Sequence, residues 1–62
     1  MCEANAFIRN NGSEELFLKS VDKIVPEEDI LILENIYGQK RMIKGKIIEM
    51  ALVEHRIIIE RL

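Results

Sequence analysis

The sequence contains one cysteine, so no internal disulfide can reinforce the fold. It has no run of the roughly 18 apolar residues that a membrane-spanning helix needs. Its start is acidic and polar, so we expect no secretory signal. Basic residues are not in excess, since 9 Lys and Arg stand against 11 Asp and Glu, for a net charge of -2. These absences argue against a secreted, a membrane and a broadly nucleic-acid-binding protein. A free thiol fits the reducing cytoplasm, where we expect this protein.

The length of 62 residues predicts a single small domain, residues 1–62. Domains of this size bury only about 60% of the surface that their unfolded chain exposes, so a monomer is marginal. Without a disulfide, a metal or a second subunit is the remaining reinforcement. The apolar content is 48% and rich in isoleucine, which favours a β core with apolar surface left over for association.

The first half of the chain has the pattern of a hairpin. Residues 2–9 alternate between small or apolar and polar side chains, which predicts a half-buried strand. "NNGS" at 10–13 predicts a tight turn, because asparagine and glycine accept positive φ. A second strand over 15–25 would place Leu16 and Leu18 inward. Its alternation then slips, which predicts a bulge or a sharp bend.

The middle of the chain predicts further short strands. Pro26 has no amide hydrogen and is expected to end the second strand. The run "ILIL" at 30–33 predicts a strand that is buried on both faces or meets another chain. Gly38 begins a turn, 41–44 form a short strand, and Gly45 marks another corner.

The last segment, residues 46–62, is ambiguous. Its apolar residues recur at helical spacing, whereas its many β-branched residues favour strands. Periodicity leaves both open. We favour two strands joined by "EHR" at 54–56, because the rest of the chain reads as antiparallel β and needs closing. The result is an all-β antiparallel barrel of about five to six short strands. Dimerisation through the first strand or the "ILIL" strand would cover an exposed edge.

The opening "MCE" offers donors for a metal. The amine of Met1, the backbone nitrogen of Cys2 and the Cys2 thiolate can close two five-membered chelate rings in one plane. Nickel(II) and copper(II) prefer such planar geometry, whereas zinc is tetrahedral. A second copy across a two-fold axis could supply another thiolate. Glu3 and His55 are the alternatives within one chain.

A simpler interpretation is also open for these residues. Cysteine often serves as a small buried hydrophobe, and one cysteine cannot make a zinc-spacing motif. His55 lies among charged neighbours in an expected turn, which is typical of a solvated residue.

The chain nevertheless resembles the CooT family of small nickel-binding proteins, which are associated with carbon monoxide dehydrogenase maturation. The resemblance rests on Met1, Cys2 and Glu3, on a strand and turn that follow, and on a similar length with repeated aliphatic strands. It implies a homodimer of SH3-like or Sm-like barrels that binds Ni(II) through Cys2 and, less directly, Met1. It implies a β conformation for the last segment, and a nickel enzyme or its maturation factors as partners. It carries no role over to Glu3 or His55.

Two other functions compete with nickel binding. A small Sm-like RNA-binding module could contact phosphates through a basic loop, formed by Lys40, Arg41, Lys44 and Lys46. The chain has few aromatic residues for base stacking, however. A thiol enzyme would need a base such as His55 beside Cys2, and no oxyanion-hole motif is present. We therefore expect a protein that is not an enzyme.

Overall fold

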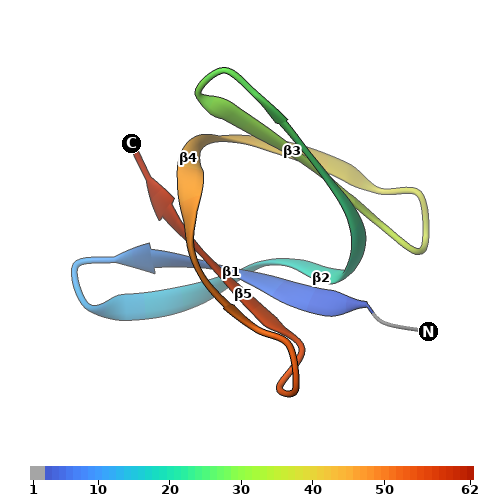
Figure 1. Ribbon diagram of the computed structural model, residues 1–62, viewed down its shortest axis with the longest axis horizontal. Coiled ribbons are helices and arrows are strands. Elements are labelled where there is room, and N and C mark those ends of the chain that lie inside the picture. Colours follow the sequence, from blue (N-terminus) through green and yellow to red (C-terminus); the bar gives the residue numbers. More distant parts are fainter. Residues whose placement is uncertain (1–2) are drawn as a thin grey trace.

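The computed structural model describes residues 3–62, which form a closed barrel of five strands (Figure 1). The strands are β1 (Ala4–Asn10), β2 (Ser13–Glu27), β3 (Ile30–Asn35), β4 (Lys40–Ala51) and β5 (Arg56–Arg61). Each strand pairs antiparallel with the next, and β1 and β5 close the ring as a parallel pair. Consecutive strands alternate in direction, so the first and the fifth necessarily run the same way. The predicted all-β barrel is confirmed, and the last segment is β, as we favoured.

The barrel interior is filled by aliphatic side chains from all five strands. Leu33 and Ile59 are fully shielded from solvent. Ile58 is buried on the opposite side of β5, where it pairs with Phe7 of β1. Burying a side chain of this size stabilises the fold by about 1.5–3 kcal/mol. The core comprises Ala6, Ile8, Leu18, Val21, Leu31, Leu33, Ile43, Ile57 and Ile59.

The β1–β2 hairpin is joined by the predicted turn, with Asn11 and Gly12 both at positive φ. The predicted bend in β2 is confirmed by shifts of register with β1 and with β3. Leu18 pairs with Ala6 and is buried, but Leu16 pairs with Phe7 and is 55% exposed. Our inward placement of Leu16 is therefore wrong. The irregularity between the two pairs changes which face alternate residues of β2 occupy.

Pro26 does not end β2, which continues to Glu27. The pairing of β2 with β1 stops at Val21, so near Pro26 the strand pairs only with β3. Proline is tolerated on such an edge because its missing amide hydrogen costs no ladder bond there. The prediction from Pro26 is wrong for this reason.

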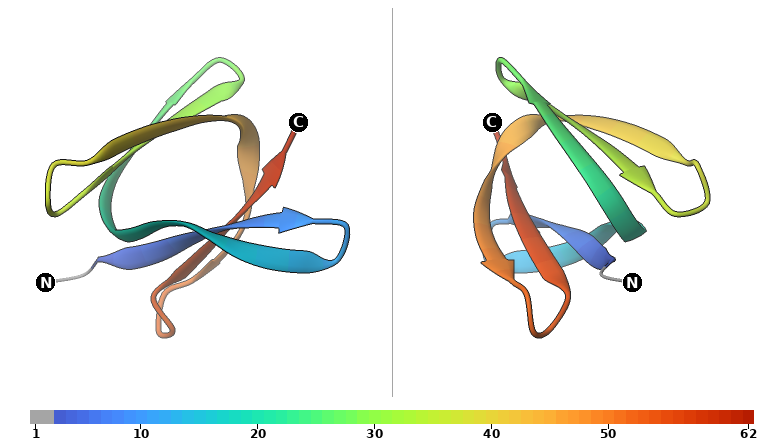
Figure 2. Two further views of the ribbon diagram at one scale, coloured as in Figure 1. Left: turned by 180° about the vertical axis from the view of Figure 1, so that it is seen from behind. Right: turned by 45° about the vertical axis from the view of Figure 1, so that its right-hand side comes forward.

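Gly45 is not a corner between two strands. β4 passes through it without a break and bends around the barrel (Figure 2). The predicted short strand at 41–44 is thus the first part of one long strand. Because residues 41–44 and the segment after Gly45 belong to one strand, the barrel has five strands, the lower of the two numbers predicted.

The "ILIL" strand, β3, is buried on one face only within this chain. Leu31 and Leu33 point into the core, whereas Ile30 is 40% exposed. Gly38, at positive φ, lies in the turn between β3 and β4, as predicted. Within residues 3–62, no helix has the length and apolar character to cross a bilayer.

Candidate metal site

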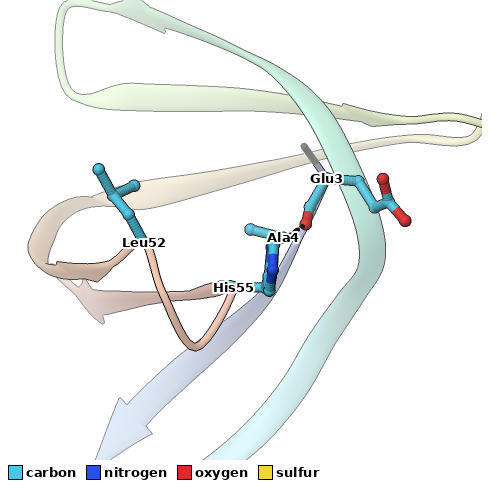
Figure 3. A pocket seen from close by; sticks show the side chains of 4 residues that line it. All are labelled: Glu3, Ala4, Leu52 and His55. Carbon is cyan, nitrogen blue, oxygen red and sulfur yellow. Dashed lines mark hydrogen bonds between the residues drawn. The ribbon is translucent and has the colours of Figure 1, made fainter. Parts of the chain in front are cut away.

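Two of the predicted site residues lie together at one end of the barrel. Glu3 and His55 are 52 positions apart in sequence, yet His55 Nδ1 is 3.1 Å from the Glu3 carbonyl oxygen (Figure 3). Met1 and Cys2 lie outside the described residues. The fold therefore connects the segment that follows Cys2 with the predicted turn at His55.

His55 ends the turn between β4 and β5. Its amide donates a hydrogen bond to the Leu52 carbonyl at 3.2 Å, and its φ of 56° is left-handed. Its own carbonyl accepts a hydrogen bond from the Asn5 amide at 2.8 Å. His55 thus contacts Glu3, just before β1, through its ring, and Asn5 of β1 through its backbone.

A second residue with a strained backbone holds the beginning of β1 from β2, the strand on its other side. Ser20, in the irregular part of β2, has a φ of 58°, and its amide donates to Asn5 Oδ1 at 3.0 Å. Such left-handed conformations cost non-glycine residues of order 1–3 kcal/mol and persist where the surrounding structure imposes them. Asn5 is consequently bonded to β2 through its side chain and to the His55 turn through its backbone.

The hydrogen bond to Glu3 also defines the histidine tautomer. A carbonyl oxygen can only accept, so Nδ1 carries the proton. In the neutral ring, Nε2 then holds a lone pair. This is the arrangement found where a second protein group orients an imidazole toward a metal.

An apolar surface surrounds this corner of the barrel. A pocket of about 200 Å³ is lined by Glu3, Ala4, Leu52 and His55 (Figure 3). An adjacent pocket of about 270 Å³ shares Ala4 and Leu52 with it and is also lined by Ile24 and Met50. Leu52 is 75% and Met50 53% exposed. We call Ala4, Ile24, Met50 and Leu52 the N-terminal apolar surface.

Residues 3–62 do not contain a complete metal site. Nowhere in this range do three His, Cys, Asp or Glu side chains come together. The Glu3 carboxylate is directed away from the His55 ring, and only the Glu3 carbonyl meets it (Figure 3).

The model of the family described as "CO dehydrogenase accessory protein CooT" matches residues 1–60. The chain belongs to the CooT family. A crystal structure described as CooT from Carboxydothermus hydrogenoformans is 57% identical, with a TM-score of 0.94 over 98% of each chain. Comparison with curated proteins gave no match. The family predicted from the sequence is confirmed.

In this CooT family member, the predicted basic loop does not exist. Lys40, Arg41, Lys44 and Lys46 all lie on strand β4. Arg41 stacks on the Phe17 ring at 4.1 Å and donates to the Phe17 carbonyl at 2.9 Å. The lysines are spread along the strand, where Lys40 pairs with Glu34 and Lys46 with Glu60. The prediction of a basic loop is wrong because residues 40–46 are part of one continuous strand.

Our sequence predictions missed a cluster of charged residues formed by Arg9, Glu14 and Arg56. Glu14 of β2 accepts a hydrogen bond from Arg9 of β1 at 2.9 Å and another from Arg56 of β5. The bond from Arg9 lowers the pKa of the Glu14 carboxyl, and the charge of Arg56 lowers it further. Arg56 also lies over the Phe7 ring at 5.0 Å. This cluster links three strands on the outside of the barrel, and only the closed sheet brings its members together.

Proposed function

We propose that this protein binds nickel(II) through Cys2, one ion per homodimer, and provides the ion for carbon monoxide dehydrogenase maturation in the cytoplasm. The match of residues 1–60 to a family described as a CO dehydrogenase accessory protein is the observation that supports this most. That description also favours a carrier over an enzyme.

The proposed donor set is planar and contains sulfur. The Cys2 thiolate, the Cys2 backbone nitrogen and the Met1 amine would bind the ion, and the Cys2 thiolate of the partner copy would be a further donor. Nickel(II) accepts this geometry, and zinc does not. The lack of a three-residue metal cluster within residues 3–62 agrees with a site assembled from the chain start and a second copy.

The proposed dimer would use the N-terminal apolar surface. This surface begins at Ala4, two positions after Cys2, and includes the exposed Met50 and Leu52. Covering apolar surface stabilises an assembly by about 25 cal/mol per Å². A small barrel gains from such an interface and from a metal that binds only the assembled state. Assignment of the barrel to the SH3-like or Sm-like class stays a prediction.

Nothing in the arrangement of the basic residues favours the RNA-binding alternative. Arg41 is engaged with Phe17, and the remaining basic residues do not form a loop. We do not propose it.

Native mass spectrometry with added nickel tests the proposal directly. The wild type should appear as a dimer with one nickel ion, together with a thiolate charge-transfer absorption. Cys2→Ser should remain folded and lose both the bound ion and the absorption. The same spectra give the mass of the chain and hence the state of Met1. Unchanged nickel binding by Cys2→Ser, or none by the wild type, would refute the proposal.

The dimer surface has its own matched pair of variants. Leu52→Glu places a charge on the N-terminal apolar surface and should give a monomer by sedimentation velocity. Met42→Glu makes the same change at a residue that is 68% exposed on the outer side of β4, and should leave the dimer intact. If Met42→Glu gave a monomer and Leu52→Glu stayed a dimer, the interface would instead lie on the outer face of β2, β3 and β4.

A further inference from the structure

We infer that His55 is a positioning residue for the proposed nickel site. Through its Nδ1–H it holds the Glu3 carbonyl and so fixes the course of the chain as it leaves the barrel toward Cys2. The inference rests on the proposed nickel function, and it assigns the imidazole a role other than that of a ligand.

The position of this bond at the end of β1 supports the role. Pairing of β1 with β2 begins at Ala4 opposite Val21, and pairing with β5 begins at Asn5 opposite Arg56. Glu3 precedes both ladders. The His55 ring therefore extends the attachment of the chain beyond the first paired residue, to the residue bonded to Cys2.

The backbone of His55 points to the same conclusion. At a φ of 56° a glycine would be free of strain, whereas residues with a side chain are uncommon there, histidine less so than most. The backbone bond from the Asn5 amide to the His55 carbonyl needs no particular side chain. What the histidine adds is the 3.1 Å bond to Glu3 and a wall of the pocket beside Ala4 (Figure 3).

Holding Glu3 matters for a metal that binds at Cys2. Two planar chelate rings and a thiolate from the partner require the two chain starts to approach in one orientation. A tethered Glu3 removes conformations that the chain would otherwise lose on binding the ion. Residues that orient metal ligands without touching the metal typically change affinity by about 10–100-fold.

Two substitutions separate positioning from ligation. His55→Gly removes the ring at a backbone conformation that glycine adopts freely, so the fold should not be weakened by strain. His55→Asn places an amide nitrogen near the position of Nδ1 and tolerates a left-handed φ, but it has no counterpart of Nε2. Asparagine can thus keep the bond to Glu3 and cannot replace an imidazole ligand.

Nickel titration followed by the charge-transfer absorption measures the effect. We expect His55→Gly to raise the nickel Kd by about tenfold or more, and His55→Asn to restore affinity and the wild-type spectrum. Equal affinity of His55→Gly and wild type would overturn the inference. Failure of His55→Asn together with an altered spectrum would also overturn it, in favour of direct ligation.

A nickel-free measurement keeps this result separate from the proposed function. Heteronuclear NOE values at Glu3 and Ala4 should fall in apo His55→Gly and recover in apo His55→Asn. If the wild type bound no nickel, the proposed function and the positioning role would both fail. The NOE values would still report whether the hydrogen bond from His55 holds Glu3. Unchanged NOE values in His55→Gly would show that the ring does not hold Glu3 and would overturn the inference alone.

Discussion

Gly45 of β4 lies directly against the backbone of Glu60 in β5. A methyl group at Gly45 would sit 2.5 Å from the Glu60 carbonyl oxygen and 3.2 Å from Ile59 Cγ2. The Gly45 amide also donates to the Asp29 carbonyl at 3.0 Å, which ties the bend of β4 to the β2–β3 turn. Backbone contact at this point allows β4 to leave β3 and pair with β5 without a break.

Gly45→Ala should therefore destabilise the barrel by about 1–3 kcal/mol, because backbone atoms must move to admit the methyl group. For a domain of this size, each kcal/mol corresponds to a fall in Tm of about 4–8 °C. Gly12→Asn is the comparison, because a side chain there would meet no atom within 4 Å and only the positive φ of 84°, which asparagine tolerates better than most residues, opposes the change. Its loss of stability should be smaller than that of Gly45→Ala. Equal Tm values for Gly45→Ala and wild type in thermal unfolding would contradict the close approach.

Asn35 organises the turn between β3 and β4, and Asn35→Ala should weaken it. Its buried Oδ1 accepts hydrogen bonds from the amides of Tyr37 and Gln39, and its Nδ2 donates to Gln39 Oε1. Removing these groups leaves two amides short of a partner, at a cost of about 1–3 kcal/mol. Urea unfolding gives the free energy, and hydrogen exchange at the Gln39 amide gives the local loss.

Gln39→Ala is the matched control for Asn35→Ala. It removes only the side-chain bond between the two residues, at an exposed position that water can reach. Its effect should be clearly smaller. Equal losses for the two variants would show that the two backbone bonds to Asn35 Oδ1 do not matter.

Glu14 should make the stability depend on pH in the acid range. The bond from Arg9 lowers the folded-state pKa of Glu14 below its ordinary value of 4.5. The stabilisation is therefore present above about pH 4.5 and is lost as the pH falls through the lowered pKa. Glu14→Gln should flatten the decline of Tm with falling pH, measured by circular dichroism.

Glu15→Gln serves as the control for Glu14→Gln. It removes the same charge from the next residue, which takes no part in the Arg9–Glu14–Arg56 cluster. The pH profile of Glu15→Gln should follow that of the wild type. Profiles that change equally in the two variants would assign the effect to net charge.

Local patterns in the sequence were enough to predict the first hairpin, the bend in β2 and the turn at Gly38. The "NNGS" turn, the strand that precedes it and the bend in β2 follow from turn chemistry and from alternation, which act over a few residues. Predictions failed where the outcome depended on a neighbouring strand. Pro26 remains inside β2 because β1 has already separated from it, and Leu16 points outward because of the irregular register with β1.

For the candidate site, too, local sequence patterns predicted one part, and contacts between distant strands decided the rest. "MCE" and the family resemblance pointed to Cys2, which lies outside the described residues. The contact between Glu3 and His55 could not be predicted, because it arises when the parallel β1–β5 pair closes the ring. The Arg9–Glu14–Arg56 cluster depends on the same closure.

By itself, the sequence determined the first hairpin with its turn, the turn at Gly38 and a thiol at position 2, whereas its periodicity left residues 46–62 open between helix and strands. These properties reside in side-chain size, branching and the φ preferences of glycine and asparagine, which need no distant partner. Only the tertiary structure decided that β4 is one bent strand, that five strands close through a parallel seam, and that His55 holds Glu3. Those features depend on how closely strands that are distant in sequence can approach each other in the barrel. A pattern of neighbouring residues in the sequence does not contain this information.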